Sequence, residues 1–110
     1  MEVFVKGDVV IVPFPFSDLS SSKRRPAWVV ANLPGEDIIL SQVTSKLLKD
    51  EYFISLLDSD FISGSLKQDS NIRPNRIFIA SKSIIRYKAG SVNSGKLSEV
   101  RNKIVSLLDQ

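Results

Sequence analysis

Apolar residues along this chain occur in short runs that are separated by turn-forming residues. Runs rich in valine and isoleucine, bounded by glycine, proline, asparagine or aspartate, are typical of β-strands. The pattern predicts strands over residues 9–14, 27–31, 37–43, 52–57 and 76–80, and a short sixth strand over residues 84–87. The run at 52–57, YFISLL, is almost wholly apolar, which predicts burial on both faces or at an interface. Residues 58–71 and 88–95 contain polar residues and glycines and are predicted to be loops.

The hydrophobic period changes near the C-terminus, which predicts one amphipathic helix over residues 97–108. Ser98 is the predicted N-cap. The predicted apolar face holds Leu97, Val100, Ile104, Leu107 and Leu108, and the residues outside it are Lys96, Glu99, Arg101 and Lys103. The 110 residues therefore predict one domain over 1–110, a small, strongly curved antiparallel sheet or barrel of five to six strands with a terminal helix.

One stretch near the start, residues 7–32, combines a strand, a polar loop and a second strand. Three consecutive cations, Lys23, Arg24 and Arg25, directly precede Pro26. A proline disfavours the helical conformation of the residue before it, so Arg25 is predicted to be extended. Because a buried strand follows it and the loop at 17–22 precedes it, Arg25 is expected on a rigid edge beneath a flexible segment. Reactive cations are suited to such a position.

Composition narrows the function classes. The chain has no cysteine and no histidine, which removes disulfides, thiolate catalysis and the commonest imidazole ligands and general bases. The acidic pairs Asp50-Glu51 and Asp58-x-Asp60 lack a third clustered ligand, so they predict solvated turns, with no metal and no cofactor. The chain shows neither an apolar run of about 18 residues nor a secretory signal, which predicts a cytoplasmic protein without a membrane span.

Basic residues are concentrated in the second half of the chain. From residue 61 onward nine residues are basic and three are acidic, although the net charge is only +3. The asymmetry indicates either a surface that faces a polyanion or a solvated basic face, and both readings stay open.

Five motifs, in order and spacing, resemble the PemK/MazF family of toxin endoribonucleases, and the fourth resembles its PemK-like branch. They are GDVVIVPFPFSD, KRRPAWVVAN, SQVTSK, SNIRPNRIF and GKLSEVRNKIVSLL. The resemblance implies an SH3-like β-barrel with a C-terminal helix, a homodimer, and metal-independent, sequence-specific cleavage of single-stranded RNA. It also implies a cognate antitoxin that inhibits the toxin, with DNA engaged only indirectly through that antitoxin.

The same resemblance assigns the catalytic roles to Arg25 and Thr44. Residues expected to bind the RNA are Lys23, Arg24, Ser45, Ser70, Asn71, Arg73 and Arg76. The alternative for these cations is a solubilising surface charge, and the alternative for Thr44 is a strand residue or a helix N-cap.

The residue types are consistent with this chemistry. The 2′-hydroxyl of RNA can attack its neighbouring phosphate, and the resulting phosphorane needs stabilisation. The Arg25 fork suits bidentate phosphate contact, and preorganised contacts of this kind are worth about 3–4 kcal/mol. Thr44 can donate a hydrogen bond to a phosphate oxygen or hold the 2′-hydroxyl. Two alternatives remain on the same scaffold: a non-catalytic toxin that poisons gyrase, and a barrel that binds nucleic acid without cutting it.

Overall fold

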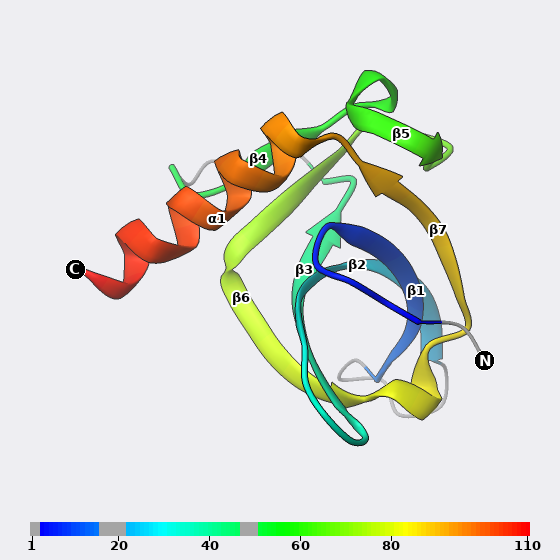
Figure 1. Ribbon diagram of the computed structural model, residues 1–110. Helices are drawn as coiled ribbons and strands as arrows, with labels where there is room; N and C mark the ends of the chain where they lie inside the picture. The colour runs from blue at the N-terminus through cyan, green and yellow to red at the C-terminus, as the bar shows by residue number, and fades with distance from the viewer. Residues whose placement is uncertain (1–2, 16–21, 47–50) are drawn as a thin grey trace.

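The computed structural model describes residues 3–15, 22–46 and 51–110, and these form one antiparallel sheet with a C-terminal helix (Figure 1). The sheet order is β4-β6-β3-β2-β1-β7-β5. The strands are β1 (Asp8–Pro15), β2 (Ser22–Asn32), β3 (Asp37–Thr44), β4 (Ile54–Leu56), β5 (Phe61–Gly64), β6 (Ser70–Ser81) and β7 (Tyr87–Val92). Two 3-10 turns, η1 (Asp58–Asp60) and η2 (Lys82–Ile84), and the helix α1 (Ser94–Leu108) complete the fold.

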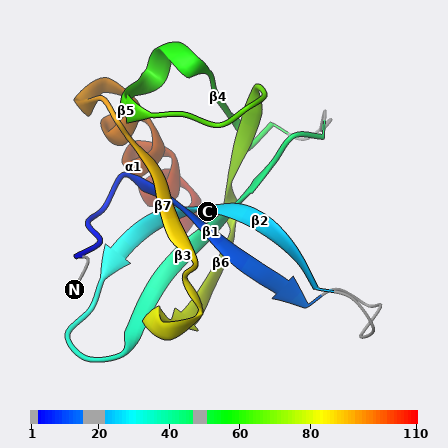
Figure 2. The same cartoon turned by 90° about the vertical axis from the view of Figure 1, so that its right-hand side faces the viewer.

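The sheet curls strongly on itself, and α1 lies on its outside beside β4 and β6 (Figure 1). Turned by 90°, the molecule shows β1 and β2 side by side and running in opposite directions (Figure 2). The predicted fold class, a small curved antiparallel sheet with one terminal helix, is confirmed, with seven strands where five to six were predicted. No helix in the described part of the chain is long and apolar enough to cross a membrane.

Both faces of the sheet carry apolar cores. On the α1 side, Trp28, Ile72 and Val100 are among the fully buried residues, and Ile104 packs against them. On the opposite face, residues such as Val12 form a second cluster beneath the segment that includes η2. Strands buried on both faces read as continuous apolar runs, which explains why β1, β2 and β3 were visible in the sequence.

Two strands differ from their predicted limits. The first strand was predicted to end at residue 14, yet β1 continues through Pro13 and pairs with β2 up to Pro15. The prolines are tolerated because β7 pairs only with residues 8–11 of β1, so this part of β1 lies at an edge. The predicted strand at 52–57 is shorter, and its burial on both faces is wrong: Ile54 and Leu56 are buried, but Ser55 between them is exposed.

The two predicted loops, 58–71 and 88–95, contain structure that the sequence concealed. Residues 58–64 form η1 and β5, β6 begins at residue 70, and β7 runs through residues 87–92, where only a strand at 84–87 was predicted. Gly90 was read as a strand breaker, but a Cβ there would lie 2.4 Å from the carbonyl oxygen of Ser63. Gly64 has a φ of +67°, and a Cβ there would lie 2.0 Å from the carbonyl oxygen of Ala89. The glycines therefore permit β5 to approach β7 closely.

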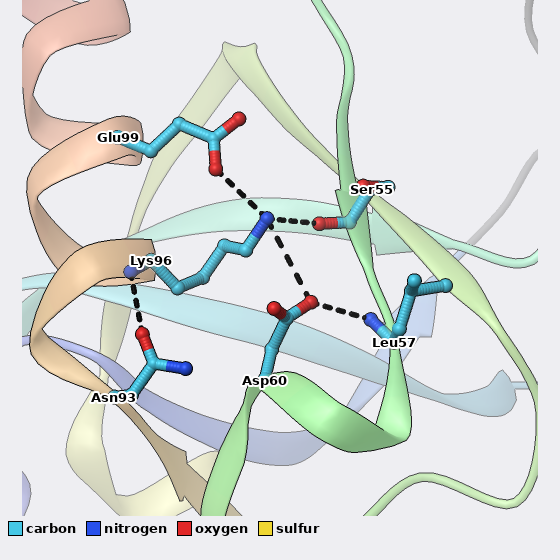
Figure 3. Close-up of polar contacts among 6 residues, drawn as sticks. All are labelled: Ser55, Leu57, Asp60, Asn93, Lys96 and Glu99. Carbon is cyan, nitrogen blue, oxygen red and sulfur yellow. Dashed lines mark hydrogen bonds and ion pairs between the residues drawn. The ribbon is translucent and has the colours of Figure 1, made fainter.

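The helix begins earlier than predicted, and its cap is a different residue. The side chain of Asn93, not that of Ser98, accepts the hydrogen bond from the Lys96 backbone N–H, at 2.7 Å. Lys96 was placed outside the apolar face but is only 8% exposed, and its ammonium group contacts β4, η1 and Glu99 (Figure 3). Leu108 was placed on the buried face but is 77% exposed.

Candidate functional site

A pocket of about 470 Å³ opens where the start of β2 and the end of β3 meet β7 and the segment that links β5 to β6. Its lining includes four cations and five hydroxyl groups from parts of the chain that are distant in sequence. The described lining residues are Ile11, Arg24, Arg25, Pro26, Val43, Thr44, Ser45, Ser65, Leu66, Lys67, Gln68, Ser70, Tyr87, Lys88 and Ala89. The sheet therefore brings the two predicted catalytic residues, Arg25 and Thr44, into one cavity.

Arg25 occupies a rigid position on β2. It lies opposite Val12 of β1, and the ladder to β3 begins two residues later at Ala27. Arg25 itself is half-buried, whereas Ala27 is completely buried. The prediction of an extended arginine at the entrance of a buried strand is thus confirmed. The loop at 17–22 that was expected to cover it lies outside the described residues, except for Ser22.

Thr44 is the last residue of β3, and its side chain is half-buried. Its hydroxyl accepts a hydrogen bond from the Lys46 backbone N–H at 3.1 Å, and the Asn71 amide donates to the Lys46 carbonyl at 3.2 Å. A threonine hydroxyl has one donor and two acceptor sites, so this contact leaves its O–H able to donate. The turn therefore fixes Thr44 while keeping its proton for a ligand.

The sheet register places Arg25 and Thr44 on one face. Ala27 lies opposite Gln42. Arg25 is two residues before Ala27 on β2, and Thr44 is two residues after Gln42 on β3, which is the same direction across an antiparallel pair. Side chains alternate with a period of two along a strand, so these four side chains share a face of the sheet. Asn71, which lies opposite Thr44 on β6, belongs to the same face.

The pocket is strongly positive. Arg24, Arg25, Lys67 and Lys88 line it, and no carboxylate does so among the described residues. The carboxylate of Asp8, which is 1% exposed, lies behind the lining, 3.9 Å from the Lys88 ammonium. It accepts hydrogen bonds from the Ser91 hydroxyl and the Val5 N–H, both at 2.9 Å, which anchors this part of β7. A cavity of this kind is suited to an anion.

Five of the nine predicted site residues line the pocket, and four do not. Those that line it are Arg24, Arg25, Thr44, Ser45 and Ser70. Ser70 is buried, and its hydroxyl donates to the Gln68 carbonyl at 3.1 Å. The four outside the lining are Lys23, Asn71, Arg73 and Arg76. Lys23 and Arg76 are exposed, and Asn71 stabilises the turn after Thr44.

Arg73 and Arg76 flank an irregular part of β6. Arg73 lies opposite Gln42 and is half-buried, and its carbonyl accepts a hydrogen bond from Ser41. The next paired residue of β6 is Ile77, opposite Ser41, so residues 74–76 form a bulge on the β6 side. Because Arg76 lies in this bulge, it does not take part in the regular pairing of β6 with β3.

Sequence reasoning missed several lining residues: Ser65, Leu66, Lys67, Gln68, Tyr87 and Lys88. Lys67 and Lys88 were counted in the basic second half, but 58–71 and 88–95 were read as loops. That basic excess does not face one surface, because Lys96 is buried at an ion pair and Lys82 donates to the Leu33 and Gly35 carbonyls, both at 2.6 Å. The pairing of β7 with β1 brings Lys88 to the pocket, and the return of the chain after β5 brings Lys67 there.

The described residues hold no group of three carboxylates arranged to bind a metal ion. Of the acidic pairs considered in the sequence, Asp58 is exposed, in keeping with a solvated turn. Asp60 is not solvated in the same way: its carboxylate accepts the Leu57 N–H at 2.8 Å and lies 3.7 Å from the Lys96 ammonium.

Solved structures with the same fold are toxins and endoribonucleases. The MazE–MazF complex of Deinococcus radiodurans (Form-III) has a TM-score of 0.79 and 21% identity, over 99% of each chain. An endoribonuclease in complex with its cognate antitoxin, from Mycobacterial species, has a TM-score of 0.77 and 13% identity, over 97% of this chain and 96% of that one. The Mycobacterium tuberculosis toxin MazF-mt6 has a TM-score of 0.73 and 12% identity, over 93% of this chain and 96% of its own. At these identities the comparison establishes the fold.

The family itself is established by the sequence. Among curated protein sequences, none matches this chain. The model of PemK-like, MazF-like toxins of type II toxin–antitoxin systems matches residues 5–108, nearly the whole length. The chain therefore belongs to the PemK-like, MazF-like family of type II toxin–antitoxin toxins.

Proposed function

We propose that this toxin is an endoribonuclease that cleaves single-stranded RNA in the positive pocket without a metal ion. The observation that carries the proposal is the composition of that pocket: four cations and several hydroxyl groups, with no carboxylate among the described lining residues. Such a set binds a phosphodiester and stabilises the additional negative charge that develops during its cleavage. The membership of the toxin family and the endoribonuclease neighbours support the same activity.

The chemistry follows from these groups. The RNA 2′-oxygen attacks the adjacent phosphorus and forms a bond to it, while the bond from phosphorus to the 5′-oxygen breaks. The proton of the 2′-hydroxyl passes to a base, and the leaving 5′-oxygen takes up a proton. The products are a 2′,3′-cyclic phosphate and a 5′-hydroxyl. Arg25 binds the non-bridging oxygens of the phosphorane, and Thr44 donates its free O–H to one of them or holds the attacking hydroxyl.

Purified protein incubated with a long, unstructured RNA in the presence of EDTA tests the proposal. We expect cleavage at a limited set of sequences, with 2′,3′-cyclic phosphate ends detected by mass spectrometry. RNA that binds but stays intact, with and without added divalent metal ions, supports instead a barrel that binds nucleic acid without cutting it. Neither binding nor cleavage of RNA, together with inhibition of gyrase, supports the non-catalytic toxin.

The proposed partner is a cognate antitoxin with an acidic segment that covers the pocket. Solved neighbours include complexes with their cognate antitoxins. The cations that bind RNA phosphates, Arg24 and Lys67 among them, are equally suited to carboxylates, so antitoxin and RNA compete for one surface. DNA is engaged only through the antitoxin, and the cytoplasm is the proposed place of action because the substrate is messenger RNA.

A homodimer is the proposed state of the toxin in solution. The apolar run at 52–57 that first suggested it is largely absorbed by the chain's own core, since Ile54 and Leu56 are buried. The structure offers a different surface on β6. Ile79 is 64% exposed and lies opposite Ile39 of β3, and Ile77 is 45% exposed two residues away. Exposed apolar side chains grouped in this way mark an interaction surface.

Replacement of one of these residues tests the homodimer. Light scattering is expected to give wild-type protein about twice the chain mass of 12.2 kDa, and Ile79→Asp is expected to shift it towards the single-chain mass. Ile62→Asp is the matched control, because Ile62 is 71% exposed on β5 and outside this surface. A single-chain mass for the wild type at micromolar concentration contradicts the homodimer. An unchanged mass for Ile79→Asp contradicts the assigned surface.

A further inference from the structure

Tyr87 is exposed inside the positive pocket, which is unusual for an aromatic residue of this chain. It is 50% exposed, and it is the only exposed aromatic side chain among those whose burial the structure describes. Trp28, by comparison, is 2% exposed in the core. A tyrosine ring that stays half exposed to water loses part of the free energy that burial of its apolar surface would give. Packing within the chain therefore does not account for the position of Tyr87.

The register places Tyr87 in a row of apolar side chains that crosses β1 to β2, the strand that carries Arg25. Tyr87 on β7 lies opposite Ile11 on β1, and Ile11 lies opposite Pro26 on β2. Residues directly opposite each other in antiparallel strands present their side chains on the same face. All three line the pocket, and Ile11 is buried beneath it. Adjacent strands are about 4.8 Å apart, so the row extends about 10 Å from Tyr87 to Pro26. Pro26 and Arg25 are consecutive on β2, so their side chains leave opposite faces of the strand, and it is the pocket lining that brings Arg25 to the row.

Cations flank this apolar row. Lys88 follows Tyr87 on β7 and is held 3.9 Å from the buried Asp8 carboxylate, with 32% of its side chain exposed. Lys67 reaches the pocket from the segment between β5 and β6. Proteins that bind single-stranded nucleic acid combine such positive grooves with aromatic rings on which bases stack. An apolar floor between cations thus matches the alternation of base and phosphate in a single strand.

We propose that Tyr87 is a base-stacking subsite that binds the nucleobase of a nucleotide next to the cleaved phosphate. The proposal rests on the ribonuclease function proposed above and adds to it a place for the base. The Tyr87 ring stacks on the flat face of the base, and the Ile11–Pro26 row supports it from below. Because every base has such a face, Tyr87 contributes affinity and positions the scissile phosphate at Arg25, while sequence preference comes from other groups.

Binding of an RNA that the wild type cleaves tests the subsite. The cleavage site is first mapped, and the RNA is then made uncleavable by a 2′-deoxy substitution at the attacking nucleotide. Fluorescence anisotropy gives the Kd for wild type, Tyr87→Phe and Tyr87→Leu. We expect Tyr87→Phe to bind like wild type, because it retains the ring. Tyr87→Leu is expected to bind about 5- to 150-fold more weakly, because stacking on a base is lost.

An abasic scan distinguishes stacking from a structural role of Tyr87. One abasic nucleotide is placed in turn at each position around the cleavage site. A single position is expected to weaken binding to wild type strongly and binding to Tyr87→Leu hardly at all. Ile62→Leu, an exposed strand residue outside the pocket, is the matched control, and melting temperatures verify that every variant is folded.

The outcomes separate the two proposals. Wild-type cleavage with equal Kd values for wild type and Tyr87→Leu overturns the stacking subsite and leaves the ribonuclease intact. Equal abasic penalties in wild type and Tyr87→Leu also overturn it. If the wild type neither cleaves nor binds RNA, both proposals are wrong.

Discussion

Arg25→Ala is expected to lower the rate of RNA cleavage by about 10²- to 10³-fold while RNA binding weakens far less. Arg25 is half-buried on β2, and its backbone is held between the ladder to β1 and the beginning of the ladder to β3, so the strand need not rearrange to present the guanidinium. Preorganised donors act mainly on the charge that develops in the transition state, which makes the loss appear in kcat more than in affinity. Single-turnover cleavage of a mapped RNA, combined with binding of its uncleavable analogue, measures the two effects separately.

Lys23→Ala is the matched control for this experiment. Lys23 lies two residues before Arg25 on the same strand, but it is exposed and does not line the pocket. Its removal takes away one charge and is expected to cause a small, salt-dependent loss of affinity with little change in kcat. Arg25→Lys retains the charge without the planar fork, so it is expected to recover only a small part of the rate. Equal losses for Lys23→Ala and Arg25→Ala contradict a catalytic role of Arg25.

The sequence predicted the centre of the fold because packing there is simple. The middle parts of β1, β2 and β3 are largely buried on both faces, so apolar residues follow one another over residues 9–12, 27–31 and 38–40. The helix was visible because Val100 and Ile104 recur with its period. Its first turn was missed because the apolar pattern begins only at Leu97, whereas the Asn93 cap begins the helix three residues earlier.

The last two strands at one end of the sheet, β7 and β5, were the part that the sequence concealed. β5 and β7 pair with each other at one edge of the sheet, and their glycines and serines resemble a loop. Gly90 fits this strand because Ser63 approaches it across the pair, a fact that depends on a residue far away in sequence. Local propensity carries no information about such an approach.

The candidate site shows the same division between local and long-range information. Arg25 and Thr44 can be recognised in the sequence. Arg25 precedes a strongly patterned strand, Thr44 follows one, and each stands within a recognisable motif. Lys67, Tyr87 and Lys88 cannot be recognised in this way, because they reach the pocket through the pairing of β7 with β1 and the return of the chain after β5. Residues that meet only because the strands pair and the sheet curls can be assigned to the site only once the pairing of the strands is known.

Lys96 is the clearest case in which the structure reverses an inference from pattern. On a helical wheel it falls beside Glu99 on the polar side, but η1 and β4 cover that side at the first turn of α1. Its ammonium lies 2.8 Å from the Ser55 carbonyl oxygen, 2.8 Å from the Glu99 carboxylate and 3.7 Å from the Asp60 carboxylate (Figure 3). The Ser55 carbonyl and the Glu99 carboxylate accept hydrogen bonds from the ammonium, and the Asp60 carboxylate adds an ion pair.

Lys96→Met is expected to lower the free energy of unfolding by about 2–3 kcal/mol. Methionine retains the apolar stem but leaves the Ser55 carbonyl and the Asp60 carboxylate without their cation. The loss falls below that for a fully buried pair because the Asp60 side chain is 18% exposed, so water partly replaces the ammonium. For a domain of this size the melting temperature is expected to fall by about 10–20 °C, measured by circular dichroism or calorimetry.

Two further variants identify which contact matters. Glu99→Gln is expected to cost less than about 1 kcal/mol, because the Glu99 side chain is 54% exposed and its pair with Lys96 is a surface pair. Asp60→Asn removes the charge that Lys96 neutralises, so adding it to Lys96→Met is expected to cost less than the sum of the two single changes. The difference between this sum and the loss measured for the double variant is the interaction free energy between Lys96 and Asp60, which attaches α1 to η1. A Lys96→Met protein as stable as wild type, or strictly additive changes, contradicts the role assigned to this ammonium, and the helix is then held by its apolar face alone.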